Sequence, residues 1–405
     1  MNILFLTLLY PPEDVETITR LSRDGLQNQV NAFQWALIEG LKENIGERGT
    51  LSILNALPVG IFPTHYRKLW LANHASSEHY QELGGINLPG LKQRDRTRQA
   101  AQALEQWVNK SPENRTVLIY TLYLPYLLAV QAIKRRHPDL KATVIVTDLP
   151  NELGIASGRK GLLRKLEYRM GKRKNELCRK MDAFVLLTRQ MAEVLPIEDK
   201  PRIVLEGLIS PDMHLDSGQT DIPPDDRPTI LYTGTLNREL GIGDLLEAFQ
   251  EMPDVQLWLC GRGDMESEVS QVAATHDHIR YFGFVPRQTA LALQMSATAL
   301  INPRTAQGAF TRYSFPSKTL EYMQSGKPVL CCRLEGIPDE YDPYLRYIEP
   351  QTSAGIREAV RAVLALVPDE RETIGERARS FVLEKKNSRA QSAKLLQFLR
   401  QITNL

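Results

Sequence analysis

The sequence is poor in the features that mark secreted, membrane-spanning or metal-binding proteins. It has 405 residues but only 4 cysteines, none of them in a C-x-x-C pair or beside a histidine at metal-ligand spacing. No apolar run reaches about 18 residues, so we expect no transmembrane helix. The first residues, MNILFLTLLYPP, lack a basic leader and a small-residue cleavage site, and we interpret them as a buried strand rather than a signal peptide. A reduced, cytoplasmic location is expected.

Charge and composition give no sign of a special class. The formal net charge is +2, which is too small to imply an electrostatic partner for the whole chain. Hydrophobic residues make up 42% and charged residues 24%, as in ordinary globular proteins. At roughly 100–200 residues per domain, the length predicts two domains, or three at most.

Short apolar runs alternate with helical patterns, which predicts parallel sheets covered by helices on both faces. In the first half, strands are expected near 2–8, 50–54, 116–121, 142–148, 182–187 and 202–206, and helices near 28–44, 93–110, 124–136, 160–181 and 187–195. In the second half, strands are expected near 229–233, 255–260, 279–282, 298–302 and 328–331, and helices near 240–251, 264–275, 287–296, 317–325, 353–367, 369–383 and 387–401.

A polar stretch separates the two halves. Residues 216–228 read DSGQTDIPPDDRP, which is rich in Asp and Pro and predicts an interdomain linker. The expected domains are 1–215, onto which a C-terminal helix within 387–405 packs back, and 229–386. We therefore predict an α/β protein with two doubly wound, Rossmann-like domains, whose strands present their carboxyl ends to a ligand.

The densest motif is NPRTAQGAFTRYSFPSKTLEYMQSGKPVL, over 302–330. After a strand that ends at Arg304, a helix is expected to begin at Ser317, its N-cap candidate. A helix N-terminus attracts a diphosphate, and Lys318 would add positive charge. Glu321, on the first turn, could accept hydrogen bonds from ribose hydroxyls. A plain helix with a well-made cap explains the same residues equally well.

Three glycine turns follow other strands of this half. In YTGTLNRELGI, Gly234 would let backbone approach phosphates and Arg238 could pair with them. CGRGD, at 260–264, lacks the third glycine of a dinucleotide fingerprint and does not support an NAD site. YFGFVP, at 281–286, is a candidate nucleobase slot. Each of these could equally be a structural turn.

The order of these motifs resembles the second domain of retaining glycosyltransferases of family 4, which have the GT-B fold, over about 229–332. Four motifs in the right order are far more specific than any one. The opening GLQNQVNAFQWALIEGL, the tail and the F-P-S-K motif look like the bacterial branch that builds polysaccharides and glycolipids.

The resemblance implies a donor site in this domain. Glu321 matches the family's ribose-binding second glutamate, whereas the first glutamate, which meets the transferred sugar, falls at Tyr313. Ser317 and Lys318 match the diphosphate site, and the family's basic pair is imperfect, with Arg238 a loose match and Leu240 in place of a lysine. The implied donor-binding set is Gly234, Thr235, Arg238, Gly261, Gly283, Phe284, Arg304, Tyr313, Ser314, Pro316, Ser317, Lys318 and Glu321.

Other roles are implied for three catalytic candidates and for the first domain. Charge on the leaving diphosphate would be stabilised by Lys318 and Arg238. Asp148 stands where many relatives have a histidine that faces the sugar, although a turn aspartate is an equal interpretation. Asn28 and Gln29 are candidate acceptor contacts. No metal or other cofactor is expected, and the sequence has no D-x-D triplet to hold one.

Residues 159–180 form a basic segment with ten Lys or Arg and two Glu. A partial apolar stripe made by Leu162, Leu163, Leu166, Met170 and Leu177 predicts an amphipathic helix that could lie on an anionic membrane. A helix packed on the sheet with a solvated basic face is an equal alternative. Nucleic-acid binding fits less well, because aromatic residues are not interleaved with the charges.

The expected function is transfer of a sugar from a nucleoside diphosphate sugar, with UDP favoured by family habit. The anomeric configuration would be retained, and the acceptor would be a lipid-linked or polysaccharide molecule at the inner face of the cell membrane. Two alternatives remain open: a nucleotide-sugar epimerase of the same fold, and a non-catalytic nucleotide-sugar-binding partner in a membrane assembly.

Overall fold

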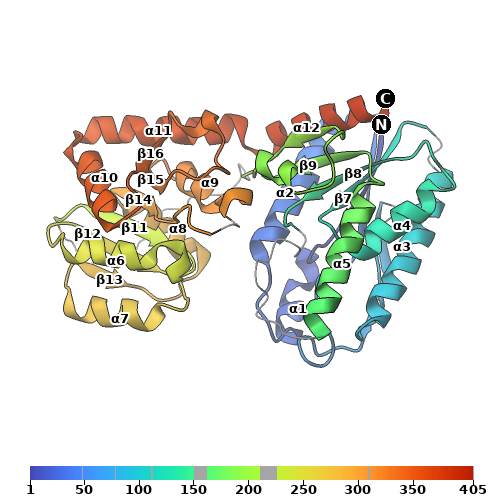
Figure 1. Ribbon diagram of the computed structural model, residues 1–405, viewed down its shortest axis with the longest axis horizontal. Coiled ribbons are helices and arrows are strands. Elements are labelled where there is room, and N and C mark those ends of the chain that lie inside the picture. Colours follow the sequence, from blue (N-terminus) through green and yellow to red (C-terminus); the bar gives the residue numbers. More distant parts are fainter. Residues whose placement is uncertain are drawn as a thin grey trace. The chain divides into compact units, whose positions relative to one another are not determined.

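Two mainly parallel sheets form where short apolar runs alternate with helices. The computed structural model describes residues 1–47, 49–77, 79–110, 113–149, 162–209, 226–308 and 311–404. The chain divides into a first unit, Met1–Leu208 with Ser388–Leu405, and a second unit, Ile209–Asn387 (Figure 1). Both are Rossmann-like α/β domains, as expected. Most of the predicted linker, 216–225, lies outside the described residues.

The first unit contains an eight-stranded sheet in the order β10-β9-β8-β7-β1-β2-β5-β4. All neighbours are parallel except β4 and β5, and a separate antiparallel pair joins β3 to β6. The strands are β1 Asn2–Thr7, β2 Thr50–Asn55, β3 Trp70–Leu71, β4 His74–Ser77, β5 Tyr80–Glu82, β6 Gly85–Ile86, β7 Arg115–Tyr120, β8 Lys141–Val146, β9 Ala183–Leu186 and β10 Arg202–Val204. The strand order reverses between β1 and β7.

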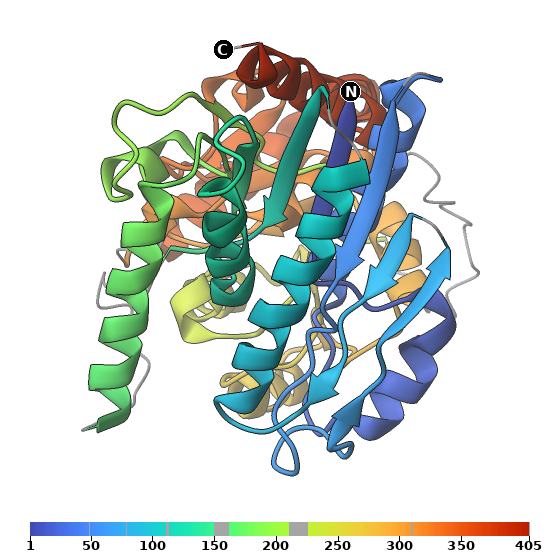
Figure 2. The same cartoon turned by 90° about the vertical axis from the view of Figure 1, so that its right-hand side faces the viewer.

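Helices cover both faces of this sheet. They are α1 Val15–Leu21, α2 Asn28–Ile45, α3 Leu91–Lys110, α4 Leu124–Lys134, α5 Leu162–Cys178 and α12 Ser388–Thr403, with 3₁₀ turns η1 Pro12–Asp14 and η3 Arg189–Glu193. Figure 2 shows α5 along the margin of the unit, beyond α4. The C-terminal α12 packs on α2, and a Cβ on Gly40 would lie 2.2 Å from Ser388 O. Ser392 Oγ donates to Leu37 O at 3.2 Å.

The second unit has a six-stranded parallel sheet in the order β13-β12-β11-β14-β15-β16. Its strands are β11 Thr229–Thr233, β12 Gln256–Cys260, β13 Ile279–Tyr281, β14 Ala299–Asn302, β15 Val329–Cys332 and β16 Leu345–Ile348. Its helices are α6 Ile242–Gln250, α7 Glu266–Thr275, α8 Arg287–Ser296, α9 Ser317–Gln324, α10 Ser353–Ala365 and α11 Pro368–Lys385, with η4 Arg238–Leu240, η5 Thr311–Tyr313 and η6 Asp339–Tyr341. The strand order reverses between β11 and β14.

Some elements differ from the sequence-based expectation. The helix expected over 187–195 is only the 3₁₀ turn η3, because Leu195 precedes Pro196 and a residue before proline disfavours the α conformation. Strand β16 was not expected, since its four residues are buried only at their ends and do not alternate. The short β3, β4, β5, β6 and helix α1 were also missed.

A buried tyrosine stands at the reversal point of each sheet. In the second unit, pairing of β11 with β14 ends at Leu231, so the backbone of Thr233 has no strand partner on that side. The Tyr322 hydroxyl accepts from Thr233 N at 2.8 Å and donates to Thr233 O at 3.0 Å. In the first unit, the Tyr126 hydroxyl lies 2.8 Å from Thr7 O and 3.0 Å from Leu54 O. Both rings are fully buried, and burial raises the pKa of both hydroxyls far above its ordinary value.

The contact between Tyr322 and Thr233 is predicted to be costly to remove. Tyr322→Phe would leave a buried N–H and a buried carbonyl unsatisfied, and should lower the free energy of unfolding by about 1–3 kcal/mol in urea titrations. Tyr344→Phe is the matched control, because that hydroxyl has no hydrogen bond within the described parts of the chain. Equal stability of both variants would contradict the assigned contact.

Candidate functional site

Three predicted glycine turns meet at the carboxyl edge of the second sheet. Gly234 N donates to Cys260 O at 2.9 Å, and Gly261 N donates to Gly283 O at 2.8 Å. Gly261 has a φ of +140°, and a Cβ there would lie 1.7 Å from Gly234 O, so only glycine fits. These turns follow β11, β12 and β13, next to the point where the strand order reverses. In open α/β sheets, this is where ligands bind.

Helix α9 begins at the same edge, but its cap differs from the prediction. Ser317 is the first helical residue, and Pro316 occupies the N-cap position without a side-chain hydrogen bond. The predicted Ser317 cap is therefore wrong, because the chain becomes helical one residue earlier. The first amide groups of α9 are not taken by a capping side chain, and the Ser317 side chain is exposed.

Glu321 lies at the centre of a small polar network. Its Oε1 accepts from Lys318 Nζ at 3.0 Å and from Gln294 Nε2 at 2.8 Å. Gln294 Nε2 also lies 3.2 Å from Thr233 Oγ1, at the end of β11. The other carboxylate oxygen, Oε2, has no hydrogen bond to any residue that the structure describes. Sequence reasoning missed Gln294, although it is the one uncharged amide in the apolar run LALQM.

Arg304 follows β14 and reaches into the loop before α9. Its Nη2 donates to Ser314 Oγ at 2.6 Å, and burial lowers the pKa of its guanidinium. Thr235 contributes its carbonyl to the buried Tyr232 hydroxyl at 2.8 Å. Tyr313 is half-buried in η5, with the Arg312 guanidinium 5.9 Å from its ring centre. The structure therefore links Arg304 to Ser314 by a direct hydrogen bond.

Arg238 is held on another side of its turn. Its guanidinium pairs with Glu268 of α7, and its backbone N donates to Asp264 Oδ1 at 3.0 Å. The hollow that Arg238 lines is acidic and contains none of the other predicted donor residues; it is formed by Gly243, Asp244, Leu246, Glu247, Gln250 and Glu268. The structure therefore does not bring Arg238 to Lys318 and Glu321.

The turn after β13 presents an aromatic surface. Phe284 is 70% exposed, and the Arg262 guanidinium lies 5.6 Å from the centre of its ring. An exposed ring beside a cation offers a flat face on which a base can stack. Behind it, Phe282 packs edge-on against Trp258, with ring centres 5.8 Å apart.

In the first unit, Asp148 and the pair Asn28 and Gln29 lie at carboxyl ends of strands. Asp148 is exposed after β8, and its Oδ2 is 3.1 Å from Thr147 Oγ1. Asn28 and Gln29 are exposed on the first turn of α2. Asn31, which was not predicted, fixes that turn by accepting from Tyr10 N at 2.8 Å.

Two cations of α3 are buried in the first unit without a carboxylate partner. Lys92 is 7% exposed and Arg96 is 2% exposed. Lys92 Nζ donates to the carbonyl of Val59, and Arg96 donates to Leu57 O at 2.7 Å and to the Tyr123 hydroxyl at 2.9 Å. Burial lowers the pKa of Lys92 to about 7, helped by the nearby charge of Arg96. Their contacts anchor the loop after β2.

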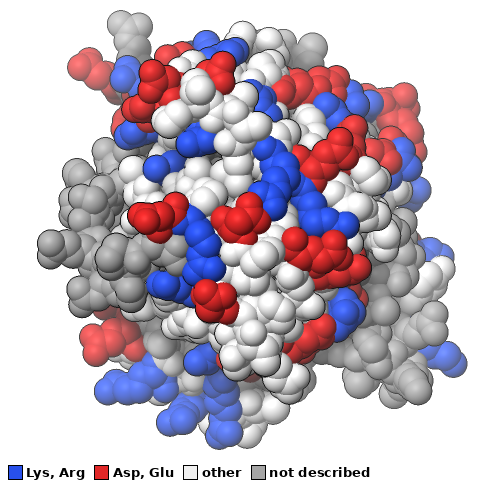
Figure 3. All heavy atoms as spheres, turned by 90° about the vertical axis from the view of Figure 1, so that its left-hand side faces the viewer, with Lys and Arg blue, Asp and Glu red and all other residues white. Residues whose placement is uncertain are grey.

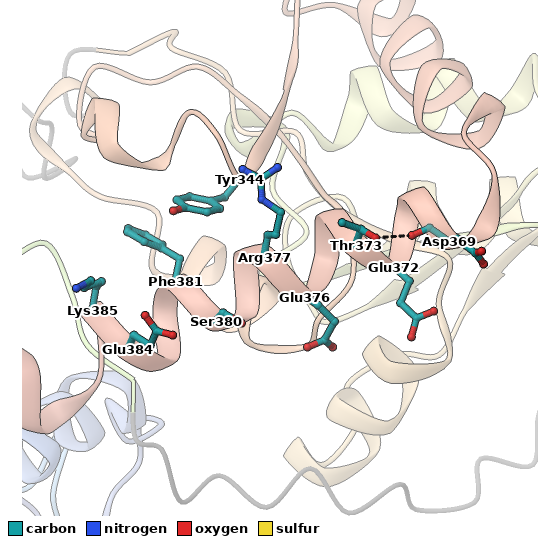
Figure 4. Close-up of a pocket in the computed structure, with 10 residues that line it drawn as sticks. All are labelled: Tyr344, Asp369, Glu372, Thr373, Glu376, Arg377, Ser380, Phe381, Glu384 and Lys385. Carbon is teal, nitrogen blue, oxygen red and sulfur yellow. Dashed lines mark hydrogen bonds between the residues drawn. The ribbon is translucent and has the colours of Figure 1, made fainter.

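A surface groove of about 640 Å³ runs along α11 (Figure 4). Tyr344 stacks on Phe381 at one end, with ring centres 4.4 Å apart. The groove contains no predicted site residue and mixes both charge signs; its lining includes Asp369, Glu372, Glu376, Arg377, Glu384 and Lys385. Figure 3 likewise shows acidic and basic side chains interspersed over one face of the molecule. Neither surface favours a ligand of one charge.

Two further searches apply to the described residues only. No three His, Cys, Asp or Glu side chains there gather closely enough to hold a metal ion. None of the helices in the described ranges has the length and apolar character needed to cross a bilayer. The four cysteines are free and buried, as expected for small apolar side chains, and burial raises the pKa of Cys260 to about 12.

Comparison with known proteins identifies the second unit. Residues 227–366 match the family model described as glycosyl transferases group 1. None of the curated proteins matches the chain. The match indicates that the protein is a glycosyltransferase.

Solved structures match over nearly the whole chain, at low identity. Sucrose-phosphate synthase from Thermosynechococcus elongatus has a TM-score of 0.63 at 14% identity, covering 99% of this chain and 98% of that one. An E. coli structure described as trehalose-6-phosphate bound with UDP-2-fluoro glucose has a TM-score of 0.65 at 9% identity, covering 99% of both chains. A UDP-forming trehalose-phosphate synthase from Burkholderia xenovorans, in complex with glucose-6-phosphate, has 0.62 at 12% identity, covering 98% and 99%. These likenesses show the GT-B fold.

The buried Lys92 predicts a pH-dependent stability. Between about pH 7 and 10.5 the unfolded chain holds a proton that the folded protein has released, so the free energy of unfolding rises with pH, by up to about 1.4 kcal/mol per pH unit from this group. Lys92→Met should remove that slope in denaturant titrations at pH 7 and 9. Lys110→Met, which changes an exposed lysine of the same helix, should keep it. Equal slopes in all three proteins would refute the assignment.

Proposed function

We propose that this glycosyltransferase uses a UDP-sugar and transfers the sugar, with retention, to a lipid-linked or polysaccharide acceptor in cell-envelope synthesis. The observation that carries the proposal is the convergence of Lys318, Glu321 and the uncapped start of α9 where the strand order reverses. A diphosphate, a ribose and a base present three chemistries in series. The carboxyl edge of the second sheet offers a counterpart for each.

The diphosphate would sit at the N-terminus of α9. The amide groups there and the Lys318 ammonium would stabilise the charge that develops on the leaving group. Lys318 Nζ has three donors, so it can bind a phosphate oxygen while it still contacts Glu321. Ser317, Pro316, Gly234 and Thr235 would complete the phosphate contacts.

The ribose and base would extend toward the glycine turns. Glu321 Oε2 would accept hydrogen bonds from the ribose hydroxyls. The base would lie against the turn of Gly283 and Phe284, beside Gly261. Two solved relatives are described as binding UDP-2-fluoro glucose and as UDP-forming, which supports uracil as the base.

The sugar would face the loop that carries Arg304, Tyr313 and Ser314. The Arg304–Ser314 hydrogen bond supports a fixed shape for that loop. Asp148 would orient the sugar or the acceptor from the first unit, near Asn28 and Gln29. Arg238 could assist the diphosphate only after its ion pair with Glu268 breaks. No metal is assigned a role, because helix and lysine charge would serve the leaving group.

The acceptor would be presented at a membrane by α5. Exposed cations on this helix include Lys165, Arg169 and Lys172, and two large apolar side chains stand among them: Tyr168 is 61% exposed and Met170 is 37% exposed. A basic face with exposed apolar side chains suits the headgroup region of an anionic bilayer. Residues 159–161 of the basic segment lie outside the described residues.

Glu321→Ala should weaken UDP binding about 10- to 100-fold by calorimetry, because it removes a hydrogen bond to a charged group worth about 1.5–3 kcal/mol. Glu358→Ala, which changes an exposed glutamate on α10, is the control and should bind UDP normally. A thermal-shift screen of UDP, GDP, ADP, CMP and their sugar conjugates without divalent metal identifies the base. Unchanged binding by Glu321→Ala would refute the placement of the ribose.

Turnover separates the proposed activity from its alternatives. The proposal expects sugar transfer from a UDP-sugar to polyprenyl-linked or glycolipid acceptors in a quenched assay. An isomerised sugar formed without acceptor would identify an epimerase. Tight UDP-sugar binding with no product from any acceptor would identify a non-catalytic partner protein.

Arg169→Glu with Lys172→Glu should reduce sedimentation with phosphatidylserine vesicles at least tenfold, because each Lys or Arg near the surface contributes about 1 kcal/mol. The control reverses two exposed cations of α3, Arg94→Glu with Arg98→Glu, and should keep vesicle binding. Loss of binding in both double variants would show a response to net charge alone.

A further inference from the structure

Gln294 is buried at a cost that packing does not explain. Its side chain, on α8, is 1% exposed, and its amide oxygen has no hydrogen bond within the described parts of the chain. A buried amide with an unsatisfied oxygen destabilises a fold, whereas a leucine or methionine would fill the same space without that penalty. The one group of Gln294 that is used is its NH₂, which donates to Glu321 and Thr233.

The direction of this contact follows from the chemistry of the pair. A carboxylate only accepts hydrogen bonds, so the NH₂ group and not the amide oxygen must face Glu321. Thr233 Oγ1 then anchors the amide to the end of β11 at 3.2 Å. Gln294 therefore connects Glu321 to the rigid edge of the sheet.

The two donors to Glu321 Oε1 differ in what fixes them. Lys318 lies three residues away on the same helix, and its side chain is 29% exposed on a flexible stem. Gln294 comes from a different helix and is buried. If Lys318 turned to a phosphate, Gln294 would still hold Oε1, and Oε2 would keep its direction.

We propose that Gln294 is a positioning residue that orients the Glu321 carboxylate for the ribose of the donor. This inference rests on the proposed function, in which Glu321 binds that ribose. Holding one oxygen in advance lowers the entropy lost when the hydroxyls bind to the other. Gln294 should thus contribute to the preference for nucleotides that carry ribose hydroxyls, although it would not touch the nucleotide.

The test compares UDP with 2′,3′-dideoxy-UDP, which lacks the hydroxyls that Glu321 would bind. Calorimetry on Gln294→Met is expected to show UDP binding weakened about tenfold and dideoxy-UDP binding unchanged. In turnover, KM for the UDP-sugar should rise while kcat stays near the wild-type value, because the ribose is remote from the reacting carbon. Gln294→Glu should weaken UDP further, since it places a second carboxylate beside Glu321.

A purely structural role would give a different result. If Gln294→Met weakened UDP and dideoxy-UDP equally, or changed neither, the proposal would be overturned. If that variant did not fold, Gln294→Asn replaces it: the shorter side chain keeps its amide but withdraws it from Glu321, and the same loss of discrimination is expected.

Glu321→Ala separates this inference from the proposed function. If it discriminates between the two nucleotides as well as the wild type does, the ribose does not lie on Glu321 and the proposed donor site is wrong. If discrimination is lost in Glu321→Ala but kept in both Gln294 variants, the donor site stands and the positioning role alone fails.

Discussion

The hydroxyl of Tyr322 holds the two backbone groups of Thr233 that β14 leaves without a partner. A sheet that reverses its strand order must open at that point, and the opening exposes polar backbone in an otherwise apolar core. The first unit meets the same constraint with Tyr126, near the ends of β1 and β2. In both units a phenol, which combines an apolar ring with one polar group, suits a site that is buried and polar at once.

The candidate donor site is built on that closed point. Tyr322 and Glu321 are neighbours on α9, so the contact that holds Tyr322 to β11 also sets where Glu321 lies. Gln294 reaches the same residue, Thr233, through its side chain. One strand end therefore receives two helices, and the groups that would bind phosphate and ribose are fixed to the sheet rather than to a loop.

The sequence was sufficient to place most strands and helices and to single out Lys318 and Glu321, because these depend on local periodicity and motif order. It could not place Gln294 or Tyr322, whose partners are set by which strands are adjacent. Arg238 shows the same limit, since its partner Glu268 lies 30 residues away on α7. The cap at Ser317 was judged from residue type, whereas Pro316 takes that position.

The packing of α12 on α2 has a consequence for the order of events at the ribosome. The apolar side chains of α2, Leu37 and Leu41, share a core with Leu395 and Leu399 of α12. Every residue of the second unit precedes Ser388 in the chain. The unit that is synthesised first therefore completes its core last, after its partner can already have folded, and until then α2 presents an uncovered apolar surface to chaperones and proteases.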